Sequence, residues 1–410
     1  MKAGLLGEKL SHSYSPSIHR FLGDYSYDLF EISPENLSNF LKNGDFDCLN
    51  VTIPYKKAVI PYCKLLSAEA AKLVSVNTIV RQENGDLYGY NSDYFGFYTM
   101  VKNTGISVKG KKALVLGSGG ASATAVAVLE ELGANVIVIS RSGENNYTNI
   151  CNHLDTALIV NTTPVGMYPN NGQTLLDISC FQQLEGVLDV IYNPARTKLL
   201  IDAESKGIKT ENGLKMLVAQ AKHSAQWFTG QILDDSIVEK IHQILSVTCQ
   251  NIILVGMPGS GKSTIGKKIA EALGREFTDS DAEIVKKTQM SIPEIFAKYG
   301  EARFRNLEAE VLRDLGKRSG LVIATGGGCV TRRENYDSLH QNGIIFWLQR
   351  EIGNLPTQGR PLSQSGNLEE MQRIRYPLYQ RFADYIITND GTQDDAVNSL
   401  LQALHLEEMK

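Results

Sequence analysis

The chain is poor in the features that mark several large classes of protein. Its six cysteines form no C-x-x-C pair, which argues against a zinc site or a disulfide framework and fits a reducing compartment. No apolar run is long enough to span a membrane, and residues 1–7 are too short an apolar start for a signal peptide. A net charge of -4 provides no basic surface for nucleic acid. We therefore expect a cytoplasmic chain that binds neither nucleic acid nor membranes.

The sequence does have the length and the apolar residues for two or three domains. Its 410 residues are 42% hydrophobic and 21% charged, and one folded domain typically takes about 150 residues. Short apolar runs alternate with helix-length segments over residues 111–212, and a second alternation extends from residue 251 to the end. This alternation is the pattern of parallel α/β sheets. Residues 246–251 are the short stretch that would join the two halves.

A glycine-rich turn lies in the first alternation, between an apolar run at residues 113–116 and a helical stretch at 124–132. Such a turn lets the backbone approach a pyrophosphate, and the helix that follows offers free N–H groups at the positive end of its dipole. The residues of the turn are Gly117, Ser118, Gly119, Gly120 and Ala121. An ordinary strand-to-helix turn is the alternative interpretation.

The end of the next apolar run indicates which dinucleotide is bound. Residues 136–139 lead to Arg141, and no Asp or Glu stands at this tip. A carboxylate there would hold a ribose 2′-hydroxyl, whereas an arginine accommodates a 2′-phosphate. We therefore predict NADP rather than NAD, with a solvated surface arginine as the alternative.

Four polar clusters precede the glycine-rich turn, within residues 11–16, 50–56, 76–78 and 89–93. They carry hydroxyl, amide and ammonium groups together with a carboxylate, a combination that suits a small polyhydroxylated acid. By physics alone, each cluster is more often a capped turn than a catalytic group, and a lone lysine is usually solvated.

Residues 4–245 resemble shikimate dehydrogenase along their whole length. The matching motifs lie within residues 11–16, 50–56, 77–78, 89–93, 117–120, 161–167, 189–194 and 213–220. The resemblance implies a substrate pocket lined by Ser13, Ser15, Asn50, Thr52, Lys56, Asn77, Asp93, Tyr192 and Gln220. It also implies that Lys56 and Asp93 form the catalytic pair. NADPH would deliver hydride to the C3 ketone of 3-dehydroshikimate while Lys56 stabilises and protonates the developing alkoxide.

A second glycine-rich motif follows the apolar run at residues 252–255 and has the spacing of a P-loop. Backbone N–H groups of such a loop cradle phosphates, its lysine reaches the β- and γ-phosphates, and its serine hydroxyl reaches Mg²⁺. The residues concerned are Gly259, Ser260, Gly261, Lys262, Ser263 and Thr264. A P-loop by itself does not identify the acceptor of the phosphoryl group.

The segments after the P-loop contain groups suited to an anionic acceptor. Asp279 and Asp281 stand two residues apart, so one can serve the metal and the other an acceptor hydroxyl. The plainer interpretation is a helix N-cap for the segment beginning at Ala282, a role that Asp281 could combine with the other. Three glycines at residues 326–328 would let a flat ligand press against bare backbone, with a mobile loop as the alternative.

Residues 250–410 resemble shikimate kinase. The resemblance implies ATP and Mg²⁺ at Lys262 and Ser263, with Asp279 near the metal through water. Asp281 would bind the ring hydroxyls and help to activate the 3-hydroxyl. The remaining implied roles are carboxylate binding by Arg305 and Arg375, ring support by Gly326, Gly327 and Gly328, and neutralisation of the transferring phosphoryl group by Arg360 of the lid. Carboxylate binding is a bidentate task that lysine performs poorly.

Together the two resemblances predict an α/β protein of three domains. They are a substrate domain over residues 1–100, completed by helices of 213–246, a Rossmann NADP domain over 101–212, and a P-loop domain like that of nucleoside-monophosphate kinases over 247–410. The predicted activities are reduction of 3-dehydroshikimate to shikimate and its phosphorylation to shikimate 3-phosphate. The alternatives are a quinate or broader dehydrogenase that uses NAD, a kinase for another small acid, or one non-catalytic half. The chain could also associate into a homo-oligomer under any of these interpretations.

Overall fold

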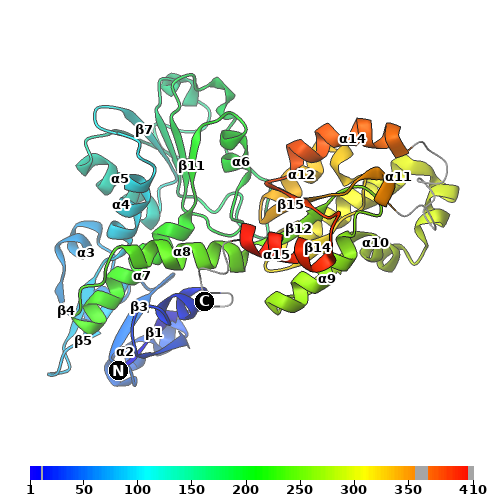
Figure 1. Ribbon diagram of the computed structural model, residues 1–410. Helices are drawn as coiled ribbons and strands as arrows, with labels where there is room; N and C mark the ends of the chain where they lie inside the picture. Colours follow the sequence, from blue (N-terminus) through cyan, green and yellow to red (C-terminus); the bar gives the residue numbers. More distant parts are fainter. Residues whose placement is uncertain (11–12, 356–367, 405–410) are drawn as a thin grey trace. The chain divides into compact units, whose positions relative to one another are not determined.

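The computed structural model describes residues 1–10, 13–355 and 368–404 (Figure 1). The chain divides into two compact units. The first contains residues 1–165, 174–192 and 202–243, and the second contains residues 166–173, 193–201 and 244–410. Within the described residues, none of the helices has the length and apolar character needed to cross a membrane. The three domain boundaries expected from the sequence stay predictions.

The first unit begins with a six-stranded sheet in the order β2-β1-β3-β5-β6-β4. Its strands are β1 (Lys2–Gly7), β2 (Ser26–Glu31), β3 (Cys48–Val51), β4 (Cys63–Leu66), β5 (Thr78–Arg81) and β6 (Leu87–Tyr90). β1 pairs in parallel with β2 and β3, whereas β5 is antiparallel to β3 and β6. The helices among them are α1 (Ser15–His19), η1 (Pro34–Asn36), α2 (Leu37–Asn43), η2 (Ile60–Tyr62), α3 (Ala68–Leu73) and α4 (Asp93–Asn103).

The second sheet of this unit is entirely parallel and has the order β11-β10-β9-β7-β8. Its strands are β7 (Lys112–Leu116), β8 (Asn135–Ile139), β9 (Leu158–Asn161), β10 (Gly186–Asp189) and β11 (Lys209–Glu211). The helices in this part of the chain are α5 (Gly120–Glu131), η3 (Ile150–His153), η4 (Ile178–Cys180) and α6 (Lys198–Glu204), and α6 has residues in both units. β9 and β10 are buried throughout, which explains why they are continuous apolar runs. The parallel α/β sheet predicted from the alternation is confirmed.

Two long helices follow, α7 (Gly213–Thr229) and α8 (Ser236–Cys249). The side chain of Asn212 caps α7 by accepting a hydrogen bond from the Leu214 N–H. α7 packs closely on α4 because Gly96 has no side chain, and a Cβ there would lie 2.7 Å from the Met216 carbonyl. α8 continues to Cys249, so most of the stretch predicted to be a joint, residues 246–251, is helical.

The second unit contains a five-stranded parallel sheet in the order β13-β14-β12-β15-β16. The strands are β12 (Asn251–Val255), β13 (Phe277–Asp279), β14 (Val322–Ala324), β15 (Gly343–Gln349) and β16 (Tyr385–Thr388). The helices are α9 (Lys262–Leu273), α10 (Ser280–Thr288), α11 (Ile292–Lys317), η5 (Cys329–Thr331), α12 (Arg333–His340), η6 (Ile352–Asn354), α14 (Leu368–Phe382) and α15 (Gln393–Ala403).

Helices cover both faces of this sheet, and the alternation of side chains along β12 shows how. Ile253 and Val255 join a core formed with α11, α12 and α14, whereas Ile252 and Leu254 join a core formed with α9 and α15 (Figure 1). Successive residues of a strand point to opposite faces, so one apolar strand supplies both cores. The P-loop α/β fold predicted for this half is confirmed.

Candidate active sites

The catalytic pair predicted in the first unit is a close ion pair. The ammonium of Lys56, in the turn after β3, lies 2.5 Å from the Asp93 carboxylate. Asp93 is the first residue of α4, where the positive end of the helix dipole favours a carboxylate. Both side chains keep some solvent exposure, so a substrate can reach them. The fold thus joins two residues that are 37 positions apart in the sequence.

Three of the predicted pocket residues belong to one buried hydrogen-bond network. The Asn50 amide donates to the Ser224 hydroxyl at 2.8 Å, and the Asn77 amide donates to the Ser92 hydroxyl at 3.0 Å. The Ser92 hydroxyl in turn lies 3.0 Å from that of Ser224 and donates to the Gln220 side-chain carbonyl at 3.1 Å. A buried network whose members are all bonded holds its side chains in one arrangement. Asn50, Asn77 and Gln220 are therefore preorganised.

Two aromatic residues extend this network and were missed by the sequence analysis. The Tyr27 hydroxyl donates to the side-chain carbonyl of Asn50 at 2.8 Å. The imidazole of His19 stacks on the Tyr27 ring, with 4.0 Å between the centroids. Burial lowers the pKa of His19 to about 3, so its ring is neutral. Neither residue stood out because a Tyr in a strand and a His in a helix are ordinary core residues.

The other predicted pocket residues lie at or near the ends of helices and strands of the same unit. Ser15 begins α1, and its backbone N–H donates to the Ser13 hydroxyl at 3.2 Å. The backbone N–H of Thr52, just beyond β3, donates to the carbonyl of Leu6 at 2.9 Å. The Tyr192 ring packs against Tyr14, with 5.5 Å between the centroids. The roles of these residues toward a substrate stay predictions.

The first glycine-rich turn lies at the carboxyl end of β7, between neighbours β8 and β9, where ligands of open α/β sheets bind. Gly117 has a φ of 112°, and a Cβ there would lie 2.9 Å from the Thr162 hydroxyl oxygen, so a larger residue does not fit. A Cβ on Gly119 or Gly120 would meet no described atom within 4 Å. The N-terminus of α5 therefore presents accessible backbone N–H groups, which fit a pyrophosphate.

The residue predicted to select the dinucleotide, Arg141, follows β8. The Gly117 N–H donates to the carbonyl of Ile139, the last residue of β8, at 2.8 Å. This bond places the tip of β8 beside the glycine-rich turn. Arg141 is exposed two residues further on, at the edge where the ribose of a dinucleotide would lie.

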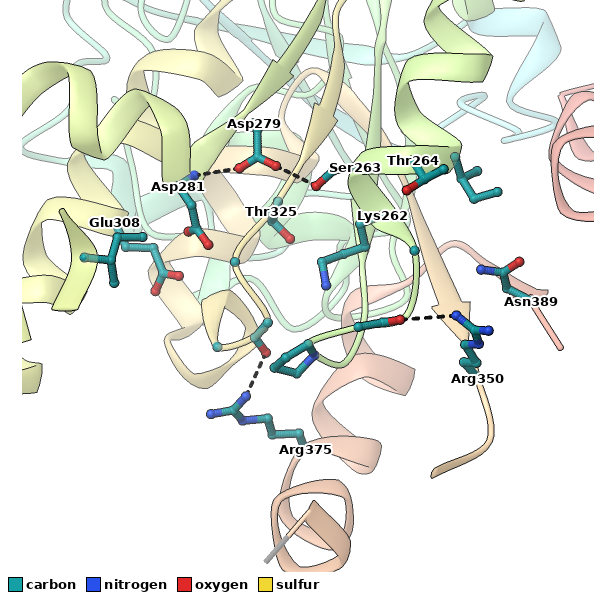
Figure 2. A pocket seen from close by; sticks show the side chains of 18 of the residues that line it. Lys262, Ser263, Thr264, Asp279, Asp281, Glu308, Thr325, Arg350, Arg375 and Asn389 are labelled. Atoms are coloured by element: carbon teal, nitrogen blue, oxygen red, sulfur yellow. Dashed lines mark hydrogen bonds between the residues drawn. The ribbon is translucent and has the colours of Figure 1, made fainter. Parts of the chain in front are cut away.

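The second candidate site is a cavity of about 810 Å³ in the second unit (Figure 2). The P-loop follows β12, Asp279 ends β13, the three glycines follow β14, and Arg350 follows β15; all four segments line the cavity. These strands are parallel, so their carboxyl ends meet at one edge of the sheet. The fold therefore collects segments from across this half of the chain around one space.

The P-loop has the backbone that close contact with phosphate requires. Gly261 has a φ of 95°, and a Cβ there would lie 2.6 Å from the side-chain nitrogen of Asn389. That amide donates to the Ser260 carbonyl at 2.7 Å and holds the loop in place. The Lys262 ammonium donates to two carbonyls of the loop, at 2.8 and 2.9 Å, so it points into the cradle. Gly259 and Thr264 also line the cavity.

The predicted metal ligands lie side by side at the edge of the P-loop. The Ser263 hydroxyl donates to a carboxylate oxygen of Asp279 at 2.7 Å (Figure 2). Mg²⁺ in such sites is usually held by one or two protein oxygens together with water and substrate phosphates. Within the described residues, no group of three or more His, Cys, Asp or Glu could hold a metal ion. Ser263 and Asp279 supply two such protein oxygens side by side, which fits a Mg²⁺ ion that is bound together with the nucleotide.

Asp281 lines the cavity, and its carboxyl has a raised pKa. α10 begins at Ser280 and is capped by Asp279, whose side chain accepts from the Asp281 N–H. The alternative interpretation, an N-cap role for Asp281, is therefore wrong, because the extended backbone of the cap belongs to Asp279. Burial, followed by the charges of Asp279 and Glu308, raises the pKa of Asp281 to about 6. A carboxyl that titrates near neutrality suits proton transfer from a hydroxyl.

Arg305 is held in the cavity by two carboxylates of its own helix, α11. One guanidinium nitrogen lies 2.8 Å from Glu308, and another lies 3.1 Å from Glu301. Glu308 is 1% exposed, and burial raises the pKa of its carboxyl despite the nearby arginine. The sequence analysis missed Glu308, although a position three residues after Arg305 on a helix indicates a neighbour on the same face.

Side chains of other segments lie close against the backbone of the three glycines, which leaves little room for a Cβ. A Cβ on Gly326 would lie 2.7 Å from a Glu308 oxygen, and a Cβ on Gly328 would lie 2.3 Å from the Arg305 guanidinium. The Gly327 carbonyl accepts from Arg375, a buried residue of α14, at 3.3 Å (Figure 2). The loop is thus packed between the two arginines that were predicted to bind a carboxylate.

Three further residues complete the account of this cavity. Arg360, predicted to act from a lid, lies outside the described residues. Arg350 and Asn389 line the cavity, and the sequence analysis named neither as a site residue. Both follow parallel strands, β15 and β16, whose carboxyl ends reach the P-loop only through the order of strands in the sheet.

Comparison with known proteins assigns the two halves separately. Residues 5–79 match the family model for the shikimate dehydrogenase substrate binding domain, and residues 258–405 match that for shikimate kinase. The shikimate dehydrogenase (NADP(+)) of Clostridium beijerinckii is 35% identical over 262 residues, which cover 59% of this chain and 96% of that protein.

Solved structures resemble the N-terminal half of the chain. A chorismate mutase/shikimate 5-dehydrogenase fusion protein from Clostridium acetobutylicum has 34% identity and a TM-score of 0.57, covering 60% of this chain and 97% of that one. Shikimate 5-dehydrogenase from Thermus thermophilus, solved in complex with NADP(H) and shikimate, has 31% identity and a TM-score of 0.54, covering 60% and 99%. These matches confirm both resemblances: the chain belongs to the shikimate dehydrogenase family and carries a shikimate kinase domain behind it.

Proposed function

We propose that this bifunctional shikimate-pathway enzyme reduces 3-dehydroshikimate to shikimate with NADPH and then phosphorylates shikimate with ATP to shikimate 3-phosphate. The observation that carries the proposal is the match between two sites on one chain. Lys56 and Asp93 can serve a ketone, while Asp281, Arg305 and Arg375 can serve a hydroxylated ring acid. The hydroxyl made at the first site is the acceptor used at the second.

In the reduction, residues of this chain donate a proton to the substrate and orient the proton donor. Bound NADPH supplies the hydride that converts the C3 ketone to an alcohol. Lys56 donates a hydrogen bond and then its proton to the C3 oxygen, where negative charge develops. The carboxylate of Asp93, 2.5 Å away, holds the ammonium in position until that transfer. The NADP relatives and the exposed Arg141 beside the glycine-rich turn support the choice of the phosphorylated dinucleotide.

In the phosphorylation, the cavity orients the acceptor and stabilises charge. Arg305 and Arg375 bind the ring carboxylate, and the bare backbone of residues 326–328 supports the ring. The 3-hydroxyl oxygen attacks the γ-phosphorus of ATP while Asp281 accepts the hydroxyl proton. The bond between the γ-phosphorus and the oxygen that leaves with ADP breaks. Lys262 and the P-loop N–H groups bind the phosphates. Ser263 and Asp279 would hold the Mg²⁺ ion, which would supply positive charge to the phosphates.

The test of both activities is a single reaction mixture. Purified chain is given 3-dehydroshikimate, NADPH, ATP and Mg²⁺, and the absorbance of NADPH and the formation of ADP are followed together. We expect NADPH loss followed by ADP formation, with shikimate 3-phosphate as the final product. A chain that forms no ADP from added shikimate is not a shikimate kinase. Turnover of quinate with NAD as fast as of shikimate with NADP would favour the broader dehydrogenase.

A lysine variant separates the two halves. Lys56→Ala removes the proton donor, and we expect reduction to fall by about 10²–10⁴-fold while phosphorylation of added shikimate stays normal. Lys57→Ala is the matched control, because Lys57 is the exposed neighbour of Lys56 in the same turn. Loss of both activities in Lys56→Ala alone would mean that the halves do not act independently.

A further inference from the structure

We propose that Arg350 binds a phosphate oxygen of the nucleotide in the kinase cavity. It would do so from the side of the P-loop opposite to the one where the ring acid, the phosphoryl acceptor, binds. The inference rests on the proposed kinase function and adds a nucleotide-binding residue to it. Arg350 is the first residue after β15, and its guanidinium lies beside the P-loop (Figure 2). It lines the same cavity as Lys262, Ser263 and Thr264.

The position of Arg350 follows from strand pairing. β15 pairs in parallel with β12, the strand that ends at the P-loop. The contact is so close that a Cβ on Gly256, the first P-loop residue, would lie 2.6 Å from the Leu348 carbonyl. A residue two positions beyond Leu348 therefore emerges at the ligand-binding edge of the sheet.

Backbone hydrogen bonds fix Arg350 from both sides. The carbonyl of Gln349 accepts from the Asn389 N–H at 2.8 Å, and the Glu351 N–H donates to the Asp390 carboxylate at 2.9 Å. The residue is thus tied to the loop after β16 before any ligand binds. An arginine whose backbone is already fixed loses less conformational freedom when its guanidinium binds an anion.

The guanidinium keeps hydrogen-bonding capacity for a ligand. One Nη donates to the Gly259 carbonyl at 3.4 Å, a long contact. The Nε–H is buried and has no hydrogen-bond partner among the described residues. A buried donor without a partner is costly, and a guanidinium is a strong partner for phosphate oxygens. An acceptor oxygen in the cavity would satisfy Nε–H.

The surroundings of Arg350 indicate which ligand supplies the acceptor oxygen. The cavity has four lining cations within the described residues: Lys262, Arg305, Arg350 and Arg375. Arg305 and Arg375 contact the three-glycine loop at the acceptor end. Arg350 instead lies with Thr264 and Asn389 on the other side of the P-loop (Figure 2). It therefore meets the phosphate chain of ATP or ADP rather than the ring acid.

The experiment compares Arg350→Gln with the wild-type chain. We expect the dissociation constant of Mg²⁺·ADP, measured by titration calorimetry, and the KM for ATP to rise about tenfold or more, the loss expected for one charged hydrogen bond. The KM for shikimate and the NADPH-dependent activity should stay unchanged. Arg350→Lys, which keeps the charge, should recover part of the ADP affinity.

Controls make the result decisive. Arg373→Gln is the matched variant, because Arg373 is exposed on α14 and pairs with Glu370. Unchanged ADP affinity in a folded Arg350→Gln chain overturns the proposal, as does an equal loss in Arg373→Gln. A rise in the KM for shikimate without a change in ADP affinity would place Arg350 at the acceptor and also overturn it. Since ADP binding needs no turnover, failure of the wild type to phosphorylate shikimate would refute the proposed function alone.

Discussion

Replacing Asp281 by asparagine should inactivate the kinase site and stabilise the second unit. The carboxyl of Asp281 is buried near Asp279 and Glu308, which raises its pKa from 3.8 to about 6. A shift of about two pH units corresponds to about 3 kcal/mol of destabilisation in the charged form. Asparagine has nearly the same size and no charge, so it removes that cost. It also removes the proton acceptor, which should lower the phosphorylation rate by about 10²–10⁴-fold.

The sign of the pH dependence follows from the raised pKa. Above pH 6 Asp281 is ionised in both the folded and the unfolded chain, and the folded state bears the full cost of the buried charge. As the pH falls from 6 to 4, the folded state takes up a proton before the unfolded chain does, so the cost disappears. The stability gain of Asp281→Asn should therefore be largest at pH 7–8 and be lost by about pH 4.

Tryptophan fluorescence can report this gain for the second unit alone. The chain has two tryptophans, and Trp347 is buried on β15 in the core of that unit. In a Trp227→Phe background, thermal unfolding of the second unit is followed by the fluorescence of Trp347 at pH 8 and at pH 4. Asp314→Asn, at an exposed carboxylate of α11, is the control and should change stability by less than about 0.5 kcal/mol. An Asp281→Asn chain that is less stable than the wild type at pH 8 would refute the reasoning.

Two further substitutions test the three-glycine loop at residues 326–328 and the tip of β8, where the dinucleotide is expected to bind. Gly328→Ala places a methyl group 2.3 Å from the Arg305 guanidinium, so the arginine must move and the KM for shikimate should rise about tenfold, a change of about 1.4 kcal/mol. Steady-state kinetics with varied shikimate check this, and an unchanged KM would contradict the proposed contact. Arg141→Ala should raise the KM for NADPH about tenfold, as for one lost charged hydrogen bond, and leave that for NADH unchanged. Equal effects on both cofactors would show that Arg141 does not bind the 2′-phosphate.

Local sequence patterns were sufficient for the two parallel sheets and for both glycine-rich turns. A buried parallel strand must be apolar, and a turn with positive φ favours glycine, so β7, β12 and the residues after them were recognisable. The stretch at residues 246–251 was harder, because a short polar segment after a helix can also continue it. The cap of α10 was misplaced for a similar reason: Asp279 and Asp281 are both good caps, and only the backbone decided between them.

Residues that act through distant partners could not be predicted from the chain alone. Asn50 and Ser224 are 174 positions apart, and nothing in either segment indicates that they bond. Arg350 was indistinguishable from a solvated arginine until the pairing of β15 with β12 placed it beside the P-loop. Glu308 was within reach of helix periodicity, but its burial depends on the three-glycine loop that packs against it.

The sequence by itself determined the fold of each half and the chemical groups available, because backbone conformation and side-chain periodicity are local properties. The tertiary structure alone decided which groups share a site, since strand order brings together segments that are far apart in the chain. It also decided their protonation: the pKa of Asp281 depends on burial and on two neighbouring carboxylates, one of them on another helix. Electrostatic interactions depend on distance in space, and that distance is not encoded in sequence separation.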